Sequence, residues 1–191
     1  MADGRVITGY SDPYVAVYNV STAGVVSYTN KQSLARGVEV DIEVETTEDN
    51  KFYANNIVAE NEAGKFRKGT LTATVDGLKD AADNLIYGLT ANTGGYTDYD
   101  DDQTIPYCGF GCVVRYMEDG VESFMAIVLP KVMFNEHSTA AKTQEEEIDW
   151  QTQELTAQIF RDDTTKHKWK RRFTAKTTQA LALADITGFF S

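Results

Sequence analysis

The chain has 191 residues, of which 42% are hydrophobic and 25% are charged, values that predict one globular domain and exclude a chain that is disordered throughout. Acidic residues outnumber basic ones by 29 to 18, which gives a net charge of −11. Such a chain repels itself and is a poor general binder of nucleic acid, because neutralising phosphates requires a basic surface.

Two β-strands joined by a hairpin turn are expected near the N-terminus, at residues 14–20 and 25–29, with the turn at 21–24. The first five residues lack the basic-then-apolar pattern of a signal peptide. The longest apolar run, 124–129, is far shorter than the roughly 18 residues of a membrane helix. We therefore expect a soluble protein that is made in the cytosol, with no membrane partner.

An unbroken alternation of apolar and acidic residues occupies positions 37–45. Successive side chains of a β-strand point to opposite faces, so this segment predicts a strand with two chemically distinct faces. The apolar face, which is expected to point at the core, consists of Val38, Val40, Ile42 and Val44. The other face is an acidic ladder of four residues, Glu39, Asp41, Glu43 and Glu45. Like charges in a row raise the cost of bringing another anion near that face.

The segment after the acidic ladder is expected to return beside it. Residues 48–51 break the alternation, 52–60 predict a weaker strand, and 64–69 predict a loop. Clean alternation over 70–76 predicts a further strand.

Helical spacing follows at about 78–90, where apolar residues recur at Leu78, Ala82, Leu85, Ile86 and Leu89. Asp76 or Gly77 could cap this helix, which would be about three turns long. Its single apolar stripe predicts packing on a sheet.

The second half of the chain predicts more strands and two polar connections. Residues 91–104 form a loop, and 107–117 and 121–129 form a hairpin around an Asp-Gly turn. The second strand can extend past Pro130 through 131–134.

Residues 135–147 are polar and have no period, so they are expected to form a long arm. One more strand is expected at 148–160, and the tail from 177 to 190 is compatible with a short helix. The sum is an α+β fold that is predominantly β: a sandwich or partial barrel of about seven or eight strands with one flanking helix. We expect a single domain over 1–191, with polar arms or loops near 46–51, 91–104 and 135–147.

Candidate catalytic and metal-binding residues are few. The two histidines, His137 and His167, lack the neighbouring partners of a zinc site or of a nucleophile–base pair and are expected on the surface. On one straight strand Cys108 and Cys112 would be separated by about 13 Å, too far for a disulfide, so both are expected to be small buried residues.

Two further motifs favour structural roles. The Gly109–Gly111 segment lacks the third glycine and the following helix of a dinucleotide-binding loop. The aspartates of 98–102 lack the central glycine and terminal glutamate of an EF-hand, so a solvated acidic loop is expected. We therefore assign no catalytic residue, no metal ligand and no cofactor, and we do not expect an enzyme.

Residues 166–172 form the only basic cluster of this acidic chain. A docking patch for an acidic surface of another subunit and a solvated turn are the two favoured interpretations. Contact with nucleic acid, through phosphates and stacking on Trp169, ranks third because of the net charge.

Six short segments occur in an order similar to that of a known family. They are EDNKFYANN (48–56), GTLTATVDGL (69–78), PYCGFG (106–111), AIVLPKVMF (126–134), DWQTQEL (149–155) and RDDTTKHKW (161–169). With these segments in order, the chain resembles the major tail proteins of bacteriophages and prophages with long, non-contractile tails, and the resemblance covers roughly residues 10 to 173. Gln153 stands where members of that family often carry proline.

The resemblance implies a tail-tube subunit that catalyses no reaction. Such subunits form hexameric rings that stack into a hollow tube, and DNA passes through its lumen without specific binding. Implied partners are other copies of the chain and the tape-measure, tail-terminator and baseplate or initiator proteins. The implied location is the virion tail, after synthesis in the bacterial cytoplasm.

Two surfaces of the chain acquire expected roles from this resemblance. The acidic ladder is expected to face the lumen, with the outer surface of the tube as the alternative. An acidic surface of a neighbouring subunit or ring is expected to contact Lys166, Lys168, Trp169, Lys170, Arg171 and Arg172. Two other functions stay open: the inner-tube protein of a contractile injection system, and a β-barrel module that binds a small molecule in an aromatic-lined interior.

Overall fold

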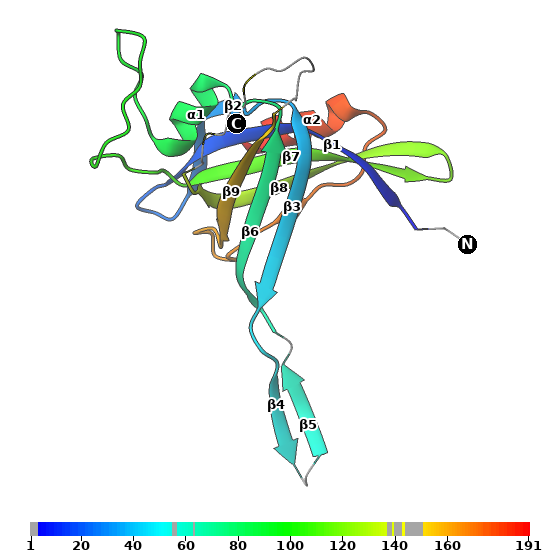
Figure 1. Ribbon diagram of the computed structural model, residues 1–191. Coiled ribbons are helices and arrows are strands. Elements are labelled where there is room, and N and C mark those ends of the chain that lie inside the picture. Colours follow the sequence, from blue (N-terminus) through cyan, green and yellow to red (C-terminus); the bar gives the residue numbers. More distant parts are fainter. Residues whose placement is uncertain (1–3, 55–56, 63, 137–138, 140–142, 144–150) are drawn as a thin grey trace.

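The computed structural model describes residues 4–54, 57–62, 64–136, 139, 143 and 151–191 (Figure 1). Within them the chain forms ten strands and two helices. These are β1 (Val6–Val20), β2 (Val26–Ser33), β3 (Gly37–Thr46), β4 (Asn50–Ala54), β5 (Ile57–Glu62), β6 (Phe66–Val75), α1 (Asp80–Tyr87), β7 (Cys108–Glu118), β8 (Val121–Phe134), β9 (Gln153–Phe160), β10 (Arg171–Arg172) and α2 (Gln179–Phe189). The expected predominantly β fold is confirmed.

One antiparallel sheet dominates the fold, with the strand order β2-β1-β7-β8-β9-β6-β3 and with β10 paired to β8. Strands β1, β7 and β8 cross behind β9, β6 and β3, so the sheet folds over on itself into two layers (Figure 1). The long strand β8 belongs to both layers, because it pairs with β7 up to Val132 and with β9 from Lys131 to Phe134. This arrangement is the partial barrel that the sequence predicts.

The main hydrophobic core lies between the two layers and extends under α1. Its largest fully buried side chains include Leu71, Tyr87, Phe110, Phe134 and Leu155. A second, smaller core lies under α2, where Ala182 and Ile186 pack on Ala16, Val113, Ala126 and Val128. Both helices therefore cover the sheet, α1 with the apolar stripe that the sequence predicts.

Helix α1 is shorter than the sequence predicts and begins later. The backbone amides of Asp76 and Lys79 donate to the carbonyls of Arg36 and Leu34, at 3.1 and 3.2 Å, so the chain is still tied to the β2–β3 connection at that point. The helix begins after Lys79 and ends at Gly88, which adopts the left-handed conformation with φ of 68°. The expected cap at Asp76 or Gly77 is thus wrong, and the helix has about two turns rather than three.

The predicted C-terminal helix is confirmed as α2, and it explains Gly109 and Gly111 of β7. A Cβ atom on Gly109 would lie 2.5 Å from the Phe190 ring, and one on Gly111 would lie 2.6 Å from Ile186 Cγ2. Glycine at these positions lets the helix approach the sheet closely. The structural interpretation of this glycine pair is therefore confirmed.

We expect Gly111→Val to lower the free energy of unfolding by about 1–3 kcal/mol, because the added side chain overpacks the contact with α2. Chemical denaturation of the purified protein measures the change. Gly188→Ala is the control, since a Cβ at this exposed position of α2 meets nothing within 4 Å. A Gly111→Val variant as stable as that control would contradict the close packing of α2.

Two predictions about the segment after the acidic ladder are wrong. Strand β3 pairs with β6, whereas β4 and β5 pair with each other in a separate two-stranded hairpin (Figure 1). Residues 66–69 of the loop expected at 64–69 instead begin β6, where Phe66 is buried and pairs with Thr46. Mutual hydrogen bonds between Thr47 and Lys65, at 2.8 and 2.9 Å, close the β3–β6 ladder before the hairpin begins.

Candidate functional site

The acidic ladder lies on β3, at one end of the sheet, and all four of its side chains are exposed. Directly paired residues of antiparallel strands point to the same face. The register therefore builds three cross-strand rows through β3, β6 and β9: Glu39–Thr74–Glu154, Asp41–Thr72–Thr156 and Glu43–Thr70–Gln158. We call these rows the polar face. They contain no apolar and no basic side chain, so the carboxylates stand beside neutral polar groups.

The last residue of the ladder has a cationic neighbour. Glu45 pairs with Lys68 across the strands, and their charged atoms are 3.1 Å apart. Both side chains are more than half exposed, so this ion pair contributes little to stability. Within the described residues, Glu39, Asp41 and Glu43 make no ion pair, which leaves their charge directed at solvent.

Of the four apolar side chains of β3 that are expected to face the core, only two do so. Val40 and Ile42 pack on the core, but Val38 and Val44 are 53% and 39% exposed. Val38 is the extra residue of a β-bulge, since the register passes directly from Gly37 to Glu39. Val44 lies opposite Gly69, which offers it no side chain to pack against. The prediction that all four valine and isoleucine residues face the core is therefore wrong.

The two terminal strands of the sheet, β2 and β3, each have one neighbour within the described part of the chain. Their second edges carry backbone amide and carbonyl groups that are free to pair with another strand. These edges lie at opposite ends of one strand order, so they are different surfaces. Two different edges of this kind allow a head-to-tail contact between copies.

The residues 161–170, which we call the basic turn, are closed by a buried carboxylate. Asp162 is only 4% exposed, and its Oδ1 accepts hydrogen bonds from the backbone amide of Lys168 at 2.7 Å and from the amide and hydroxyl of Thr164. Its own amide donates to the carbonyl of Lys168 at 2.8 Å. A buried carboxylate with these partners holds the turn in one conformation. Sequence reasoning missed this residue.

Two members of the predicted basic cluster are engaged within the chain. The ring of Trp169 stacks on that of Phe66, with centroids 4.7 Å apart and planes 7° from parallel. The guanidinium of Arg171 lies 4.7 Å from the ring centroid of Phe189, and its backbone pairs with β8. These contacts use both side chains to fasten the basic turn and α2 to the body.

The other four members of the cluster face outward. Lys166, Lys170 and Arg172 are exposed and Lys168 is partly exposed. Within the described residues these four make no ion pair. Their expected contact with another subunit stays a prediction, and the structure leaves these side chains free to make it.

The second carboxylate of the turn, Asp163, anchors the turn to β1 and β8. Its Oδ2 accepts hydrogen bonds from Lys131 Nζ and from the Tyr18 hydroxyl, both at 2.7 Å. The hydrogen bond from Lys131, and after it the one from Tyr18, holds the pKa of Asp163 below its usual range. The ammonium of Lys131 also lies over the rings of Tyr18 and Tyr107, at 5.1 and 4.5 Å from their centroids.

We expect Asp163→Asn to destabilise the protein at neutral pH by at most about 1 kcal/mol, because the carboxylate is partly exposed. A carboxylate whose folded pKa is depressed stabilises the fold above its unfolded pKa, and this stabilisation is lost as pH falls through the folded value. The difference between the variant and the wild type should therefore vanish in strong acid. Urea denaturation of the variant and the wild type, at neutral pH and in strong acid, measures this difference in the free energy of unfolding. A difference that grows on acidification would contradict the role assigned to Asp163.

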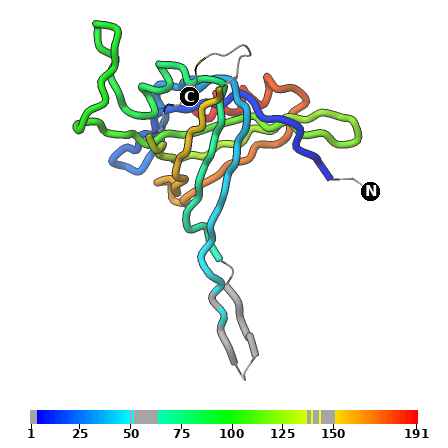
Figure 2. Tube along the Cα trace, in the orientation of Figure 1, coloured from blue at the N-terminus to red at the C-terminus, as the bar shows by residue number. Residues whose placement is uncertain are grey.

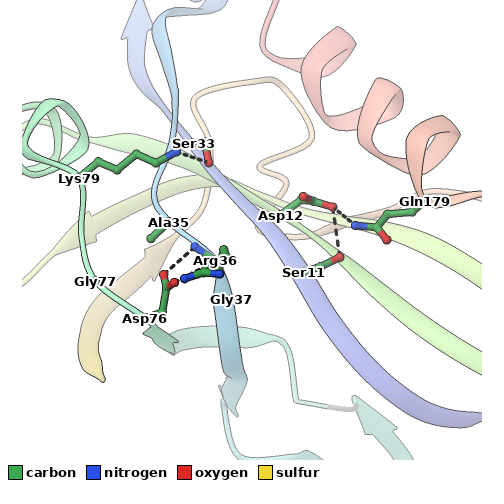
Figure 3. Close-up of a pocket in the computed structure, with 10 residues that line it drawn as sticks. All are labelled: Ser11, Asp12, Ser33, Ala35, Arg36, Gly37, Asp76, Gly77, Lys79 and Gln179. Atoms are coloured by element: carbon green, nitrogen blue, oxygen red, sulfur yellow. Dashed lines mark hydrogen bonds and ion pairs between the residues drawn. The ribbon is translucent and has the colours of Figure 1, made fainter. Parts of the chain in front are cut away.

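A shallow depression between β1, the β2–β3 connection and α2 is the site drawn in Figure 3. Each charged side chain that lines it already has a partner within the subunit. Arg36 pairs with Asp76 and holds the pKa of that carboxyl below its usual range, while Asp12 accepts from Gln179 Nε2 at 2.5 Å. Lys79 Nζ is 3.4 Å from the Ser33 hydroxyl. This depression is polar and open, unlike the apolar pocket that binds small molecules.

The remaining candidate residues fall into two groups. Cys108 and Cys112 are buried and free, as predicted, and burial raises the pKa of each thiol to about 12, so both behave as small hydrophobic residues. His167 is exposed in the basic turn, with Nδ1 3.2 Å from the Asp162 carbonyl. His137 and most of the polar arm at 135–147 lie outside the described residues. Across the described residues, no three histidine, cysteine or acidic side chains are grouped so as to hold a metal ion.

Comparison with known proteins finds no matching family model and no matching curated protein. The two helices that the structure describes are too short to span a membrane.

Proposed function

We propose that this chain is a tail-tube subunit, which assembles into hexameric rings that stack into a hollow conduit for DNA. The observation that carries the proposal is the polar face. Three consecutive rows across β3, β6 and β9 carry only acidic, threonine and glutamine side chains, and the acidic column runs along an open edge of the sheet. A surface of this composition offers no hydrophobic or cationic site at which a passing polyanion would be held.

The open edges supply a means of ring formation. If the β3 edge of one copy meets a different surface of the next, the contact is heterologous, and such contacts generate rings when the rotation closes. A closed ring of sheets has one face inward, and we assign the polar face to the lumen. Screening at physiological salt confines the repulsion of phosphates to about 8–10 Å from the wall. DNA would therefore slide without sticking.

The assembled tube requires partners other than copies of this chain. We propose the tape-measure protein inside the growing tube, the tail-terminator protein at one end and the baseplate or initiator complex at the other, with the virion tail as the location. No reaction is catalysed in this role. The same surfaces would serve the inner tube of a contractile injection system, and copurification with a sheath protein would assign the chain there.

A small-molecule-binding module is the less favoured function. The space between the two layers is filled by core side chains such as Leu71, Phe110 and Phe134, which are fully or almost fully buried. The depression in Figure 3 is lined largely by polar side chains, and its charged groups already have partners: Arg36 pairs with Asp76, and Asp12 accepts from Gln179. Neither feature offers the apolar, aromatic-lined site that this function needs.

Negative-stain electron microscopy of the purified protein, with light scattering alongside, tests the proposed function. Detached tail tips are added as seeds, because tube growth can require an initiator. We expect rings or hollow tubes with sixfold end views. A closed dimer that never polymerises in seeded reactions would overturn the proposal.

A further inference from the structure

The segment 91–104, which we call the acidic loop, is a projection in which Asp98 and Asp100 accept hydrogen bonds from Asn92 Nδ2 and the Asp102 amide, at 3.0 and 3.1 Å. Ala91 and Thr97 form a β-bridge, and the Asn92 amide donates to the Tyr96 carbonyl at 2.8 Å. Gln103 Nε2 donates to the backbone carbonyl of Tyr87 at 3.1 Å, which ties the end of the loop to α1. The loop is therefore held in shape by its own hydrogen bonds and by the helix.

Four aspartates make this loop strongly acidic: Asp98, Asp100, Asp101 and Asp102. All are exposed, and within the described residues none makes an ion pair. Two tyrosines accompany them. Tyr96 is 59% exposed, and Tyr99 is also exposed while its hydroxyl donates to Asp83 of α1 at 2.9 Å. The loop thus carries negative charge beside aromatic rings.

The basic turn has the opposite character. Asp162 and Asp163 fix its backbone to the body, and the charges of Lys166, Lys168 and Lys170 have no acidic partner among the described residues. Because the backbone of the turn is already held, binding of a partner costs little further backbone entropy.

The acidic loop projects from one edge of the sheet body, and the basic turn lies at a different edge (Figure 1 and Figure 2). Trp169 of the turn stacks on Phe66 at the start of β6, whereas the loop follows α1, which comes directly after the end of β6. Figure 2 shows the loop rising above one end of the body and the turn, in orange, at its lower edge. Within one copy the projecting part of the loop is directed away from the turn (Figure 2), so the loop is placed to reach the turn of another copy stacked in the same orientation.

We propose that the acidic loop of one copy docks on the basic turn of a second copy in the adjacent ring; this inference rests on the proposed tube function. The contact joins two different surfaces in a head-to-tail manner, so it does not close and can repeat along a tube. Complementary charges at such a contact speed association and fix its register. Tyr96 and Tyr99 add ring faces on which lysine ammonium groups can lie.

Charge reversal tests this contact. The loop variant carries Asp100→Lys, Asp101→Lys and Asp102→Lys, the turn variant carries Lys166→Glu, Lys168→Glu and Lys170→Glu, and a third protein carries all six changes. We expect seeded tube growth, followed by light scattering, to slow by about tenfold or more in each of the first two proteins, since electrostatic steering is lost. Growth should recover in the third protein, where both signs are exchanged.

Asp119→Asn is the control, because it removes one exposed charge in the β7–β8 turn without straining the positive φ of that position, and this turn lies away from both surfaces (Figure 1). It should grow tubes like the wild type. Wild-type tubes with unchanged growth in both reversal variants would overturn the docking contact and leave the tube function standing.

A wild type that forms no tubes even with seeds would overturn the tube function. The contact between the acidic loop and the basic turn is then tested separately by disulfide trapping. A mixture of Asp101→Cys and Lys170→Cys proteins is exposed to mild oxidant, with Asp119→Cys replacing Asp101→Cys as the control. The native cysteines are buried and do not interfere. A disulfide-linked pair formed only by the first mixture supports the contact, and its absence overturns it.

Discussion

Tubes built from a variant with lysine at positions 39, 41, 43 and 45 are expected to assemble but to release DNA at least about tenfold more slowly than wild-type tubes. Each substitution replaces a repelling carboxylate with a cation that can contact a phosphate, and every such contact adds to salt-dependent binding of DNA. The four side chains are exposed, so the fold should tolerate the change. Loss of the exposed Glu45–Lys68 pair costs at most about 1 kcal/mol.

The measurement is DNA release from purified phage particles after triggering, followed by the fluorescence of a DNA-binding dye. A variant with glutamine at the same four positions is the control, because it removes the negative charge without adding cations. The rate of DNA release from the glutamine variant should lie between the rates of the wild type and the lysine variant. High salt should restore the rate of the lysine variant. Release at the wild-type rate from lysine tubes would contradict the lumen assignment of the polar face.

Replacing residues 48–64 by an Asn-Gly turn is expected to abolish tube growth while the subunit still folds. Strands β4 and β5 pair only with each other among the described strands, so the main sheet does not depend on them. The paired residues Thr47 and Lys65 stay in place, and Asn-Gly favours the tight turn that would join them. An isolated two-stranded hairpin is at best marginally stable in water, which suggests that another copy stabilises it in the tube.

Thermal unfolding and seeded electron microscopy check the two halves of this expectation. The melting temperature of the variant should stay close to that of the wild type. As a control, the same Asn-Gly turn can replace 119–120, where Asp-Gly already forms the β7–β8 turn; that variant should fold and form tubes. Normal tubes from the subunit without the hairpin would show that β4 and β5 have no part in stacking.

The sequence predicts an element correctly where the pattern within one segment is enough to specify it. The acidic ladder alternates so regularly that its strand and its outward carboxylates follow from the sequence. The β7–β8 hairpin follows in the same way from Asp119 and Gly120, both of which adopt positive φ. Val38 departs from the pattern because a β-bulge depends on the partner strand, and alternation in β3 alone does not specify it.

The pattern within one segment does not predict which distant segment it pairs with. Strands are predicted at both 52–60 and 70–76, and only the observed register, from Gly37–Val75 to Thr46–Phe66, shows that the second of them lies beside β3. Trp169 is likewise expected from the sequence to contact another subunit, but its ring stacks on Phe66, a residue far away in the chain. Asp162 had a local signal that went unused, since an aspartate two residues before a threonine often closes an Asx turn.

A cryo-electron microscopy reconstruction of tubes grown from the purified protein tests the central claim most directly. The account predicts sixfold rings in which β3, β6 and β9 line the lumen, with the side chains of Glu39, Asp41, Glu43 and Glu45 at the inner wall. Tubes whose inner wall is formed by another surface, with the acidic ladder facing outward, would contradict it.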